Sequence, residues 1–284
     1  MGETIKIHET AFLTATFRSV DENLSGDCYA KLWHNEQTDL WIKDYLKSVS
    51  TEEPYSHCLR NRYFLNQIKK SIKQNNIEVL INFGAGFSMY PFLLNENLIH
   101  IEIDKPEIVE HKKQKIEDWQ NKSLLPKREI HFIGVDFNED YQRELLSKIT
   151  TIKKNKRCFI LIEGVLFFLG KNETTSLFNL FNSLQKEGDL IGSVSFQNAV
   201  SKTIAFKKML AFLAKKLTKD QALDYQLIAN EFYQNIENYK LIDQQDFFSL
   251  SKKYRHTTSL SKGEILNETM YLLEKQAPES HKKQ

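Results

Sequence analysis

Short apolar runs alternate with longer amphipathic stretches through the middle of the chain. The runs are rich in valine, isoleucine, leucine and phenylalanine, as buried parallel strands are. Strands are therefore expected over residues 79–81, 98–103, 129–135, 158–162 and 190–196. Helices are expected between them, over residues 106–120, from an N-cap at Asn138, and over 171–187 with Gly188 as the closing glycine. This alternation predicts an α/β fold, in which helices cover both faces of a parallel sheet.

The segments on either side of this core are helical in pattern. Residues 10–49 and 59–74 carry apolar positions at helical spacing, and Pro54 is expected to break the chain between them. Residues 201–239 again show helical patterns and no strand. The first of these patterns, over 201–217, sets an apolar face against lysines. We interpret it as a lid over the sheet, with contact to a membrane or a partner as the alternative.

The last part of the chain is expected to complete the sheet. Its pattern predicts a helix over 247–254 and a closing pair of strands over 256–260 and 270–274, followed by a polar tail. The chain contains no internal repeat and no low-complexity linker, which predicts one domain. Its expected parts are a helical cover (1–76), a cofactor-binding core (77–198), a helical lid insertion (199–240), closing strands (241–275) and a disordered tail (276–284).

Composition narrows the class of protein. A hydrophobic content of 41% with 27% charged residues is ordinary for a soluble globular chain, and a formal net charge of +2 argues against a general nucleic-acid surface. The three cysteines are far apart and form no C-x-x-C pair, which fits a reducing cytoplasm and predicts no metal site. No run of about 20 apolar residues occurs, so no stable membrane insertion is expected. These observations predict a soluble, cytoplasmic protein.

A glycine-rich turn follows the first strand. Gly84-Ala85-Gly86 comes directly after the apolar run, and Glu102 and Asp104 lie about 20 residues later at the end of the next strand. Ligands of open α/β sheets bind outside the carboxyl ends of the strands, and an acid at this spacing accepts hydrogen bonds from ribose hydroxyls. Met89 stands where a dinucleotide motif has its third glycine. The turn therefore favours a nucleoside without phosphates, such as S-adenosylmethionine, over a dinucleotide; the alternative is a plain strand-turn-helix.

Acids also follow the third and fourth predicted strands. Asp136 ends the third strand and Glu163 ends the fourth, so acids lie at successive strand ends on one edge of the sheet. Arg60 and Arg62, in the helix before the sheet, could pair with a ligand carboxylate. Taken singly, each acid could equally be a helix cap or a loop ion pair. Their joint placement points to a binding site for a cationic nucleoside.

Several segments, in order along almost the whole chain, resemble the leucine carboxyl methyltransferase family. The most telling is E-G-V-L-F-F-L at 163–169, which is similar to the family's E-G-V-L-x-Y-L. The others are T-A-F-L-T-A-T-F-R-S (10–19), D-C-Y-A (27–30), L-R-N-R-Y-F (59–64), N-F-G-A-G-F-S (82–88), E-I-D-K-P (102–106), D-F (136–137) and E-T-M-Y-L-L (268–273). The resemblance implies a Rossmann-like class I methyltransferase with a mostly parallel seven-stranded sheet.

The resemblance also implies a cofactor and the residues that hold it. The cofactor is S-adenosyl-L-methionine, with S-adenosyl-L-homocysteine as product and no metal. Arg18 and Arg60 are expected at the methionine carboxylate and Glu163 near its amino group. The remaining contacts are expected from the turn (Gly84, Ala85, Gly86), from the ribose acids (Glu102, Asp104) and from the adenine border (Asp136, Phe137). Two positions depart from the family pattern: Ser88 replaces an aspartate, and Phe168 replaces a tyrosine that could orient an acceptor.

The function that these observations predict is O-methylation of a small-molecule carboxylate or phenolic hydroxyl, such as a polyketide-like or other secondary metabolite. A carboxylate is already ionised near neutral pH, whereas a phenol gains from a general base, and the sequence identifies none. Aromatic residues of the insertion suit a hydrophobic acceptor: Phe206, Phe212, Phe232 and Tyr233. The alternatives are a protein C-terminal carboxyl methyltransferase and a cofactor-binding module without activity. A nucleotide-dependent oxidoreductase is the least favoured, and the oligomeric state is not predicted.

Overall fold

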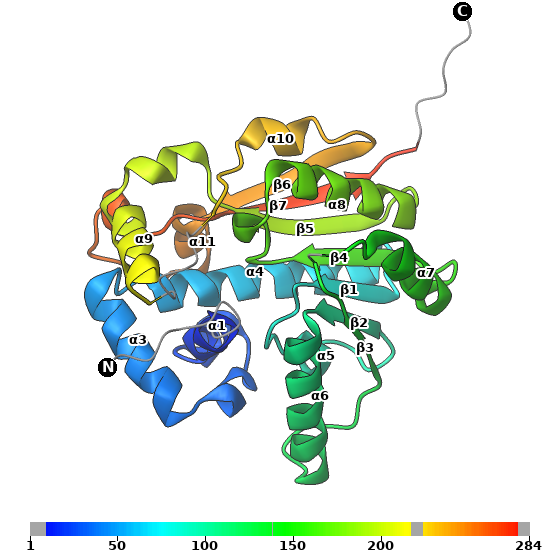
Figure 1. The fold of residues 1–284 in the computed structure, drawn as a ribbon, viewed down its shortest axis with the longest axis horizontal. Helices are drawn as coiled ribbons and strands as arrows, with labels where there is room; N and C mark the ends of the chain where they lie inside the picture. Colours follow the sequence, from blue (N-terminus) through cyan, green and yellow to red (C-terminus); the bar gives the residue numbers. More distant parts are fainter. Residues whose placement is uncertain (1–9, 138, 217–223, 278–284) are drawn as a thin grey trace, which may run out of the picture.

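A computed structural model describes residues 10–137, 139–216 and 224–277 of the protein. Its centre is one seven-stranded sheet with strand order β3-β2-β1-β4-β5-β7-β6 (Figure 1). The strands are β1 (Val79–Phe83), β2 (Ile99–Asp104), β3 (Ile130–Gly134), β4 (Cys158–Ile162), β5 (Leu190–Ser195), β6 (Tyr239–Asp246) and β7 (Thr269–Lys275). Strands β1 to β5 pair in parallel, and β7 runs antiparallel to both β5 and β6. The predicted mostly parallel seven-stranded α/β sheet is confirmed.

Helices cover both faces of this sheet. The principal helices are α1 (Thr10–Arg18), α3 (Glu36–Ser48), α4 (Glu53–Gln74), α6 (Pro106–Asn121), α7 (Gln142–Lys153), α8 (Lys171–Leu184), α9 (Ile204–Lys216) and α11 (Phe247–Tyr254). The shorter ones are α2 (Glu22–Ser25), η2 (Ala30–Trp33), α5 (Tyr90–Leu93), η3 (Leu166–Phe168), η4 (Asn198–Lys202), α10 (Asn230–Gln234) and η5 (Lys262–Glu264).

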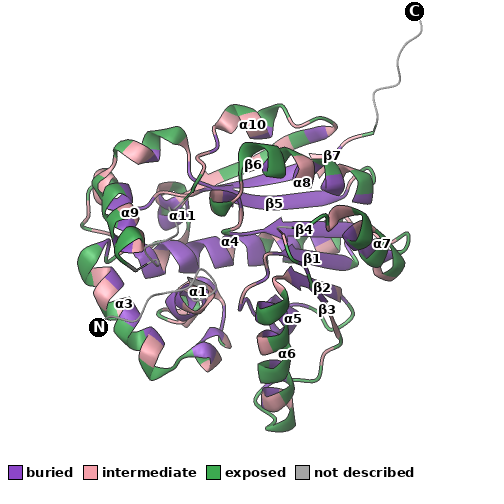
Figure 2. Cartoon of the chain, viewed as in Figure 1, coloured by how far each residue is buried: buried purple, intermediate pink, exposed green. Residues whose placement is uncertain are grey.

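Alternate residues of the central strands enter two separate hydrophobic clusters. Val79, Ile81 and Phe83 of β1 pack in a cluster with α7 and α8, whereas Leu80, which lies between Val79 and Ile81, packs in another with α4 and α11. Every residue of β1, β4 and β5 is buried, as expected of strands with both faces covered (Figure 2). Burial on both sides explains why these strands read as continuous apolar runs.

The end of the sheet differs from the prediction. Residues 256–260 form no strand, and the sheet is completed by β6, which begins at Tyr239 inside the segment expected as a lid. β6 is an edge strand whose exposed positions include Lys240 and Ile242, and a register shift separates Leu241 from Asp243. A strand buried on one side and irregular in register has no continuous apolar run, which is the pattern that identified the other strands.

Two helix boundaries also differ, and one prediction is not covered. Pro54 lies in the first turn of α4, where its missing N–H is tolerated, so it begins the helix and does not break the pattern. Helix α8 ends at Leu184, and Gly188 instead occupies the turn before β5 with φ of +81°. The predicted cap Asn138 and most of the predicted tail lie outside the described residues.

Helix α9 covers one end of the molecule by packing on α1 and α3. Phe206, Met209 and Phe212 are buried in a cluster with Leu13, Phe17, Trp41 and Tyr45. Lys207 and Lys208 face solvent on the opposite side. The apolar face of α9 is therefore satisfied within the chain. Among the described residues no helix is long and apolar enough to cross a membrane.

Candidate cofactor and acceptor site

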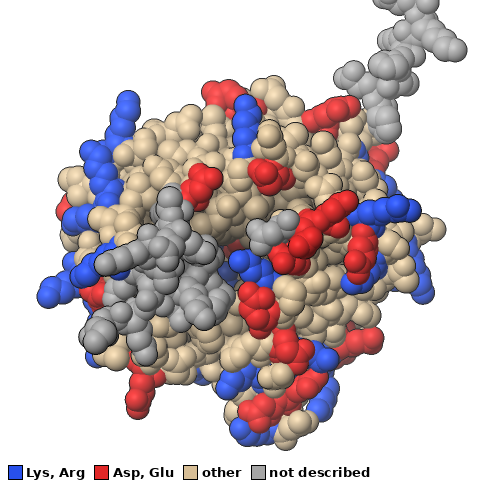
Figure 3. Space-filling view, viewed as in Figure 1, with Lys and Arg blue, Asp and Glu red and all other residues tan. Residues whose placement is uncertain are grey.

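A cavity of about 610 Å³ lies at the carboxyl ends of β1, β2 and β4, bordered by α1, α4 and η3. Its volume is in the range of small-molecule pockets. Eight predicted site residues line it: Arg18, Arg60, Gly84, Ala85, Gly86, Asp104, Phe137 and Glu163. The face drawn in Figure 3 carries both acidic and basic side chains, interspersed around a hollow at its centre.

The turn after β1 is held close to β2 and η3. The backbone N–H groups of Gly84 and Ala85 donate to the carbonyl oxygen of Ile103, at 2.8 and 3.0 Å. Gly84 has φ of +71°, and a Cβ added there would lie 1.9 Å from Cγ2 of Val165. Only glycine therefore fits at Gly84, for both conformation and space.

Asp104, at the end of β2, faces this turn. Its Oδ2 accepts from the Gly86 N–H and its Oδ1 from the Lys105 N–H, both at 2.7 Å. Burial raises the pKa of Asp104, and the N–H groups of Gly86 and Lys105 oppose that rise. Each carboxylate oxygen has two acceptor positions, so both oxygens retain one for a ligand hydroxyl.

Glu163, directly after β4, meets two buried arginines. Arg18 Nη2 donates to Glu163 Oε2 at 3.0 Å, and Arg60 Nε lies 3.5 Å from Glu163 Oε1 without hydrogen-bond geometry. The Nε atoms of Arg18 and Arg60 are buried and have no hydrogen-bond partner in the described part of the chain. Buried donors of this kind usually have partners. The arrangement thus fits a ligand that carries a carboxylate for the guanidinium groups and an ammonium for Glu163.

Behind Arg60 lies a buried cluster that sequence reasoning missed. Arg60 Nη1 donates to Glu268 Oε2 at 2.6 Å, and Arg60 Nη2 lies 3.0 Å from His57 Nδ1. His57 Nε2 in turn lies 3.3 Å from Glu53 Oε1. Burial and the two arginines lower the pKa of His57 well below its ordinary value. The spacing of Glu53, His57 and Arg60 along one helix, four and then three residues apart, was the available signal.

Two of the predicted residues do not line the cavity. Glu102 is 1% exposed and pairs with Lys112, Nζ to Oε2 at 2.5 Å, beneath the glycine turn. Asp136 follows β3 and borders a separate surface pocket with Glu139 and Tyr141. Phe137, beside it, does reach the cavity, where its ring packs on Phe83 with centroids 5.4 Å apart.

The sequence profile of the leucine carboxyl methyltransferase family matches residues 17–182 of the chain. This protein belongs to that family. The matched segment contains the glycine turn, Asp104 and Glu163, the groups that form the cavity. No protein of curated function matches the chain in sequence.

Solved structures share the fold at low sequence identity. A candidate methyltransferase from Thermobifida fusca superimposes with a TM-score of 0.64 at 12% identity, over 93% of this chain and 94% of the other. A DUF574 family protein from Streptomyces avermitilis gives 0.58 at 8%, over 92% and 97%. Magnesium protoporphyrin IX methyltransferase from Synechocystis, solved with S-adenosylhomocysteine, gives 0.50 at 9%, over 92% and 98%. The predicted family and class I methyltransferase fold are confirmed, and S-adenosyl-L-methionine is the methyl donor of this family.

The structure shows the surroundings of Ser88 and Phe168, the two residues that depart from the family pattern. Ser88 Oγ accepts from Asn82 Nδ2 at 2.8 Å and donates to the Ala85 carbonyl at 2.9 Å, so serine supports the turn with its own hydrogen bonds. The Phe168 ring is 36% exposed and lines the cavity. Phenylalanine at this position offers no hydroxyl group to the cavity.

The aromatic residues expected to receive an acceptor have another role. Phe206 and Phe212 are buried in the cluster between α9 and α3, and Tyr233 is buried in the cluster over β5. Phe232 packs partly buried against that second cluster. These aromatic rings stabilise the fold and do not line the cavity. They therefore give no reason to expect a hydrophobic acceptor.

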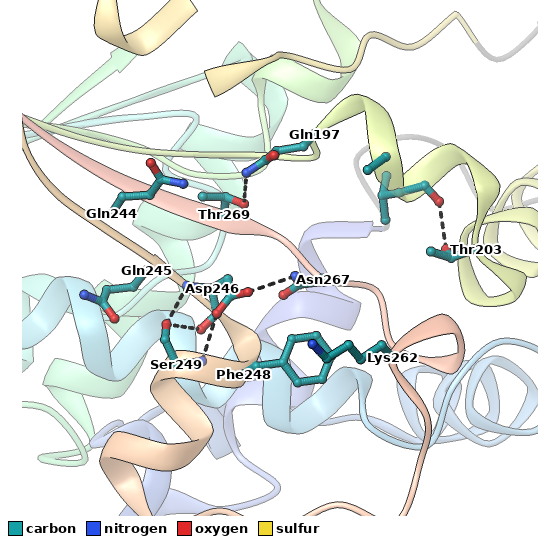
Figure 4. Close-up of a pocket in the computed structure, with 12 residues that line it drawn as sticks. Gln197, Thr203, Gln244, Gln245, Asp246, Phe248, Ser249, Lys262, Asn267 and Thr269 are labelled. Atoms are coloured by element: carbon teal, nitrogen blue, oxygen red, sulfur yellow. Dashed lines mark hydrogen bonds between the residues drawn. The ribbon is translucent and has the colours of Figure 1, made fainter. Parts of the chain in front are cut away.

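A second cavity of about 460 Å³ lies at the same edge of the sheet, beyond β5 (Figure 4). Its lining is rich in carboxamides and hydroxyls, and these groups bond to one another. Gln197 Nε2 donates to Thr269 Oγ1 at 2.9 Å, and Asp246 accepts from Ser249 N–H at 2.8 Å and from Asn267 Nδ2 at 3.1 Å. We assign this cavity no ligand. Among the described residues no cluster of histidine, cysteine or acidic side chains is placed to hold a metal ion.

Proposed function

We propose that this protein is an S-adenosyl-L-methionine-dependent O-methyltransferase that acts on a carboxylate or phenolic hydroxyl of a small molecule. The observation that carries the proposal is the convergence, in one cavity, of Asp104 with the glycine turn and of Glu163 with two buried arginines. In this reading the free acceptor positions of Asp104 take the ribose hydroxyls, and Phe137 borders the adenine. Arg18 and Arg60 hold the methionine carboxylate, and Glu163 holds the ammonium group.

The bound cofactor supplies an electrophilic methyl group, which an acceptor oxygen takes by in-line displacement from sulfur. The contribution of the protein is alignment and exclusion of water. In this proposal the ribose hydroxyls occupy the remaining acceptor positions of Asp104 and the ammonium group occupies Glu163, so neither carboxylate is free to take a proton from an acceptor. This favours an acceptor that arrives ionised, and a carboxylate meets that requirement near neutral pH.

Replacing Asp104 with asparagine should weaken the binding of S-adenosylhomocysteine by about 10- to 100-fold, since hydrogen bonds to a charged group contribute roughly 1.5–3 kcal/mol. Calorimetric titration of the wild-type protein and of Asp104→Asn measures this. The matched control is Asp118→Asn, a half-exposed acid near the end of α6 that lies outside the cavity; this variant should bind as the wild type does. Absence of binding by the wild-type protein would refute the proposed function.

The acceptor class is tested separately, with methyl-labelled cofactor and a panel of carboxylic acids and phenols. A labelled carboxyl ester releases methanol in mild base, whereas a phenyl methyl ether survives, so one treatment separates the two products. Binding of the cofactor without any labelled product from the panel or from cell extracts would instead favour a binding module without activity. Label that remains with protein would favour a protein carboxyl methyltransferase.

A further inference from the structure

Lys112 is a buried charge outside the set of residues that line the cavity. It lies in the middle of α6, is 1% exposed, and pairs with Glu102, which is equally buried, at 2.5 Å. A buried ion pair gives little net stability compared with apolar residues of the same size, because both charges lose their hydration. Such a pair therefore calls for an explanation other than stability, and its other contacts supply one.

The ammonium group also reaches the glycine turn. Lys112 Nζ lies 3.5 Å from the Ala85 carbonyl oxygen and 3.5 Å from Ser88 Oγ, at the long end of hydrogen-bonding distance. Asn82, at the end of β1, closes the ring by donating to Ser88 Oγ at 2.8 Å and approaching Glu102 Oε1 at 3.3 Å. Lys112 thus connects α6, β2 and the turn through a network that also includes the end of β1.

The cavity lies on the other side of the same turn. Gly84, Ala85 and Gly86 line it, and Asp104 holds the Gly86 N–H at 2.7 Å from that side. The turn is therefore fixed from above by Asp104 and from beneath by the network around Lys112. The positive charge of Lys112 also opposes the rise that burial causes in the pKa of Asp104, which helps to keep that carboxylate ionised.

We propose that Lys112 is a positioning residue for the cofactor: from beneath the cavity it holds the 84–88 turn in the conformation that presents its main chain to the nucleoside. The inference rests on the proposed function for the identity of the ligand. It goes beyond that function in assigning Lys112 and Glu102 a role that neither performs by touching the ligand.

The test compares Lys112→Met with Lys153→Met in the full chain. Lys153 is a matched control because its side chain is also buried, at 6% exposed, and its Nζ lies 3.9 Å from buried Asp189, which precedes β5 at the opposite edge of the sheet. Both variants lose a buried ammonium group, but only Lys112 contacts the turn. Two quantities are measured: the affinity for S-adenosylhomocysteine by calorimetry, and amide hydrogen exchange of the peptide containing residues 84–88 without ligand.

Lys112→Met should bind S-adenosylhomocysteine at least about tenfold more weakly, a loss within the range seen when supporting residues of metal sites are removed. Its 84–88 amides should exchange several-fold faster than those of the wild type. Lys153→Met should match the wild type in both measurements. Unchanged affinity or unchanged exchange in Lys112→Met, or equal losses in the control, would overturn the proposal.

Lys112→Met leaves Glu102 buried without a cation and could fail to fold, so a second variant is needed. Glu102→Gln/Lys112→Met removes both charges and is expected to fold with the same loss of affinity; wild-type affinity in this variant would also overturn the proposal. The exchange measurement needs no ligand. It therefore still tests the role of Lys112 if the wild-type protein fails to bind the nucleoside, an outcome that refutes the proposed function instead.

Discussion

Replacing Glu53 with glutamine should stabilise the protein relative to the wild type by an amount that grows between about pH 5 and pH 8. Burial, followed by the nearby charge of Glu268, raises the pKa of Glu53 from its ordinary 4.5 to about 8. The folded state therefore keeps a proton on Glu53 that the unfolded chain has already released. The contribution of Glu53 to stability therefore falls as pH rises through this window and levels off above pH 8.

The size of the effect follows from the displacement of the pKa. A change from 4.5 to about 8 corresponds to roughly 4–5 kcal/mol of unfolding free energy across the window. Glu53 is 7% exposed, and its Oε2 has no hydrogen-bond partner among the described residues, so solvent contributes little screening. The charged and titratable groups around it are His57, Arg60, Glu268 and Tyr45.

Urea denaturation of the wild type and of Glu53→Gln at pH 5, 6.5, 8 and 9 provides the measurement. The difference between their unfolding free energies should grow with pH in favour of the variant and become constant above pH 8. Any fixed packing cost of glutamine cancels in this comparison. Glu36→Gln, which changes an exposed acid of α3, is the control. Curves for wild type and Glu53→Gln that stay parallel from pH 5 to pH 9 would contradict the assignment.

Alanine at Gly84 should destabilise the protein by about 2–5 kcal/mol, whereas alanine at Gly86 should cost about 1–2 kcal/mol. Both glycines have positive φ, +71° and +44°, and an alanine there is strained by roughly 1–3 kcal/mol. They differ in space. A Cβ on Gly84 would lie 1.9 Å from Val165 Cγ2, whereas a Cβ on Gly86 would meet only the Ala11 Cβ at 3.5 Å. The extra cost at Gly84 is that of forcing Val165 away.

A second substitution isolates this contact. Val165→Ala removes the methyl group in the way, so Gly84→Ala/Val165→Ala should be more stable than the sum of the two single effects predicts, by about 1–2 kcal/mol. Urea denaturation of the four proteins forms a double-mutant cycle. Equal costs at Gly84 and Gly86, or strict additivity in the cycle, would show that the turn yields and that the contact with Val165 is unimportant.

Part of the site was predictable because it is local in sequence. The glycine turn and Asp104 belong to consecutive strands of a parallel sheet, and the carboxyl ends of such strands meet at one edge. The same rule correctly predicted that Glu163 lies at the cavity. It did not separate Glu102 from Asp104, although they are two residues apart. Glu102 turns away to a lysine on α6, and strand polarity alone does not reveal that partner.

The cluster behind Arg60, formed by Glu53, His57 and Glu268, was not predictable in the same way. Glu268 lies 208 residues from Arg60 and becomes its partner only because β7 inserts beside β5. Glu53 and His57 have a spacing that suggests one helix face, but the spacing does not say what that face meets. Likewise, the sequence suggested that the aromatic residues of α9 contact an acceptor, whereas in the structure they pack against α3.

The sequence by itself determined the alternating elements, the helical cover, the glycine turn and the acids at the strand ends, since each of these depends on periodicity or on short spacing within one or two elements. The tertiary structure decided the second edge strand, the burial of α9, the partner of Glu102 and the cluster of Glu53, His57, Arg60 and Glu268. These features arise from contacts between residues far apart in the chain. Their energy depends on burial and on the charge that each group meets after folding, which no local pattern records.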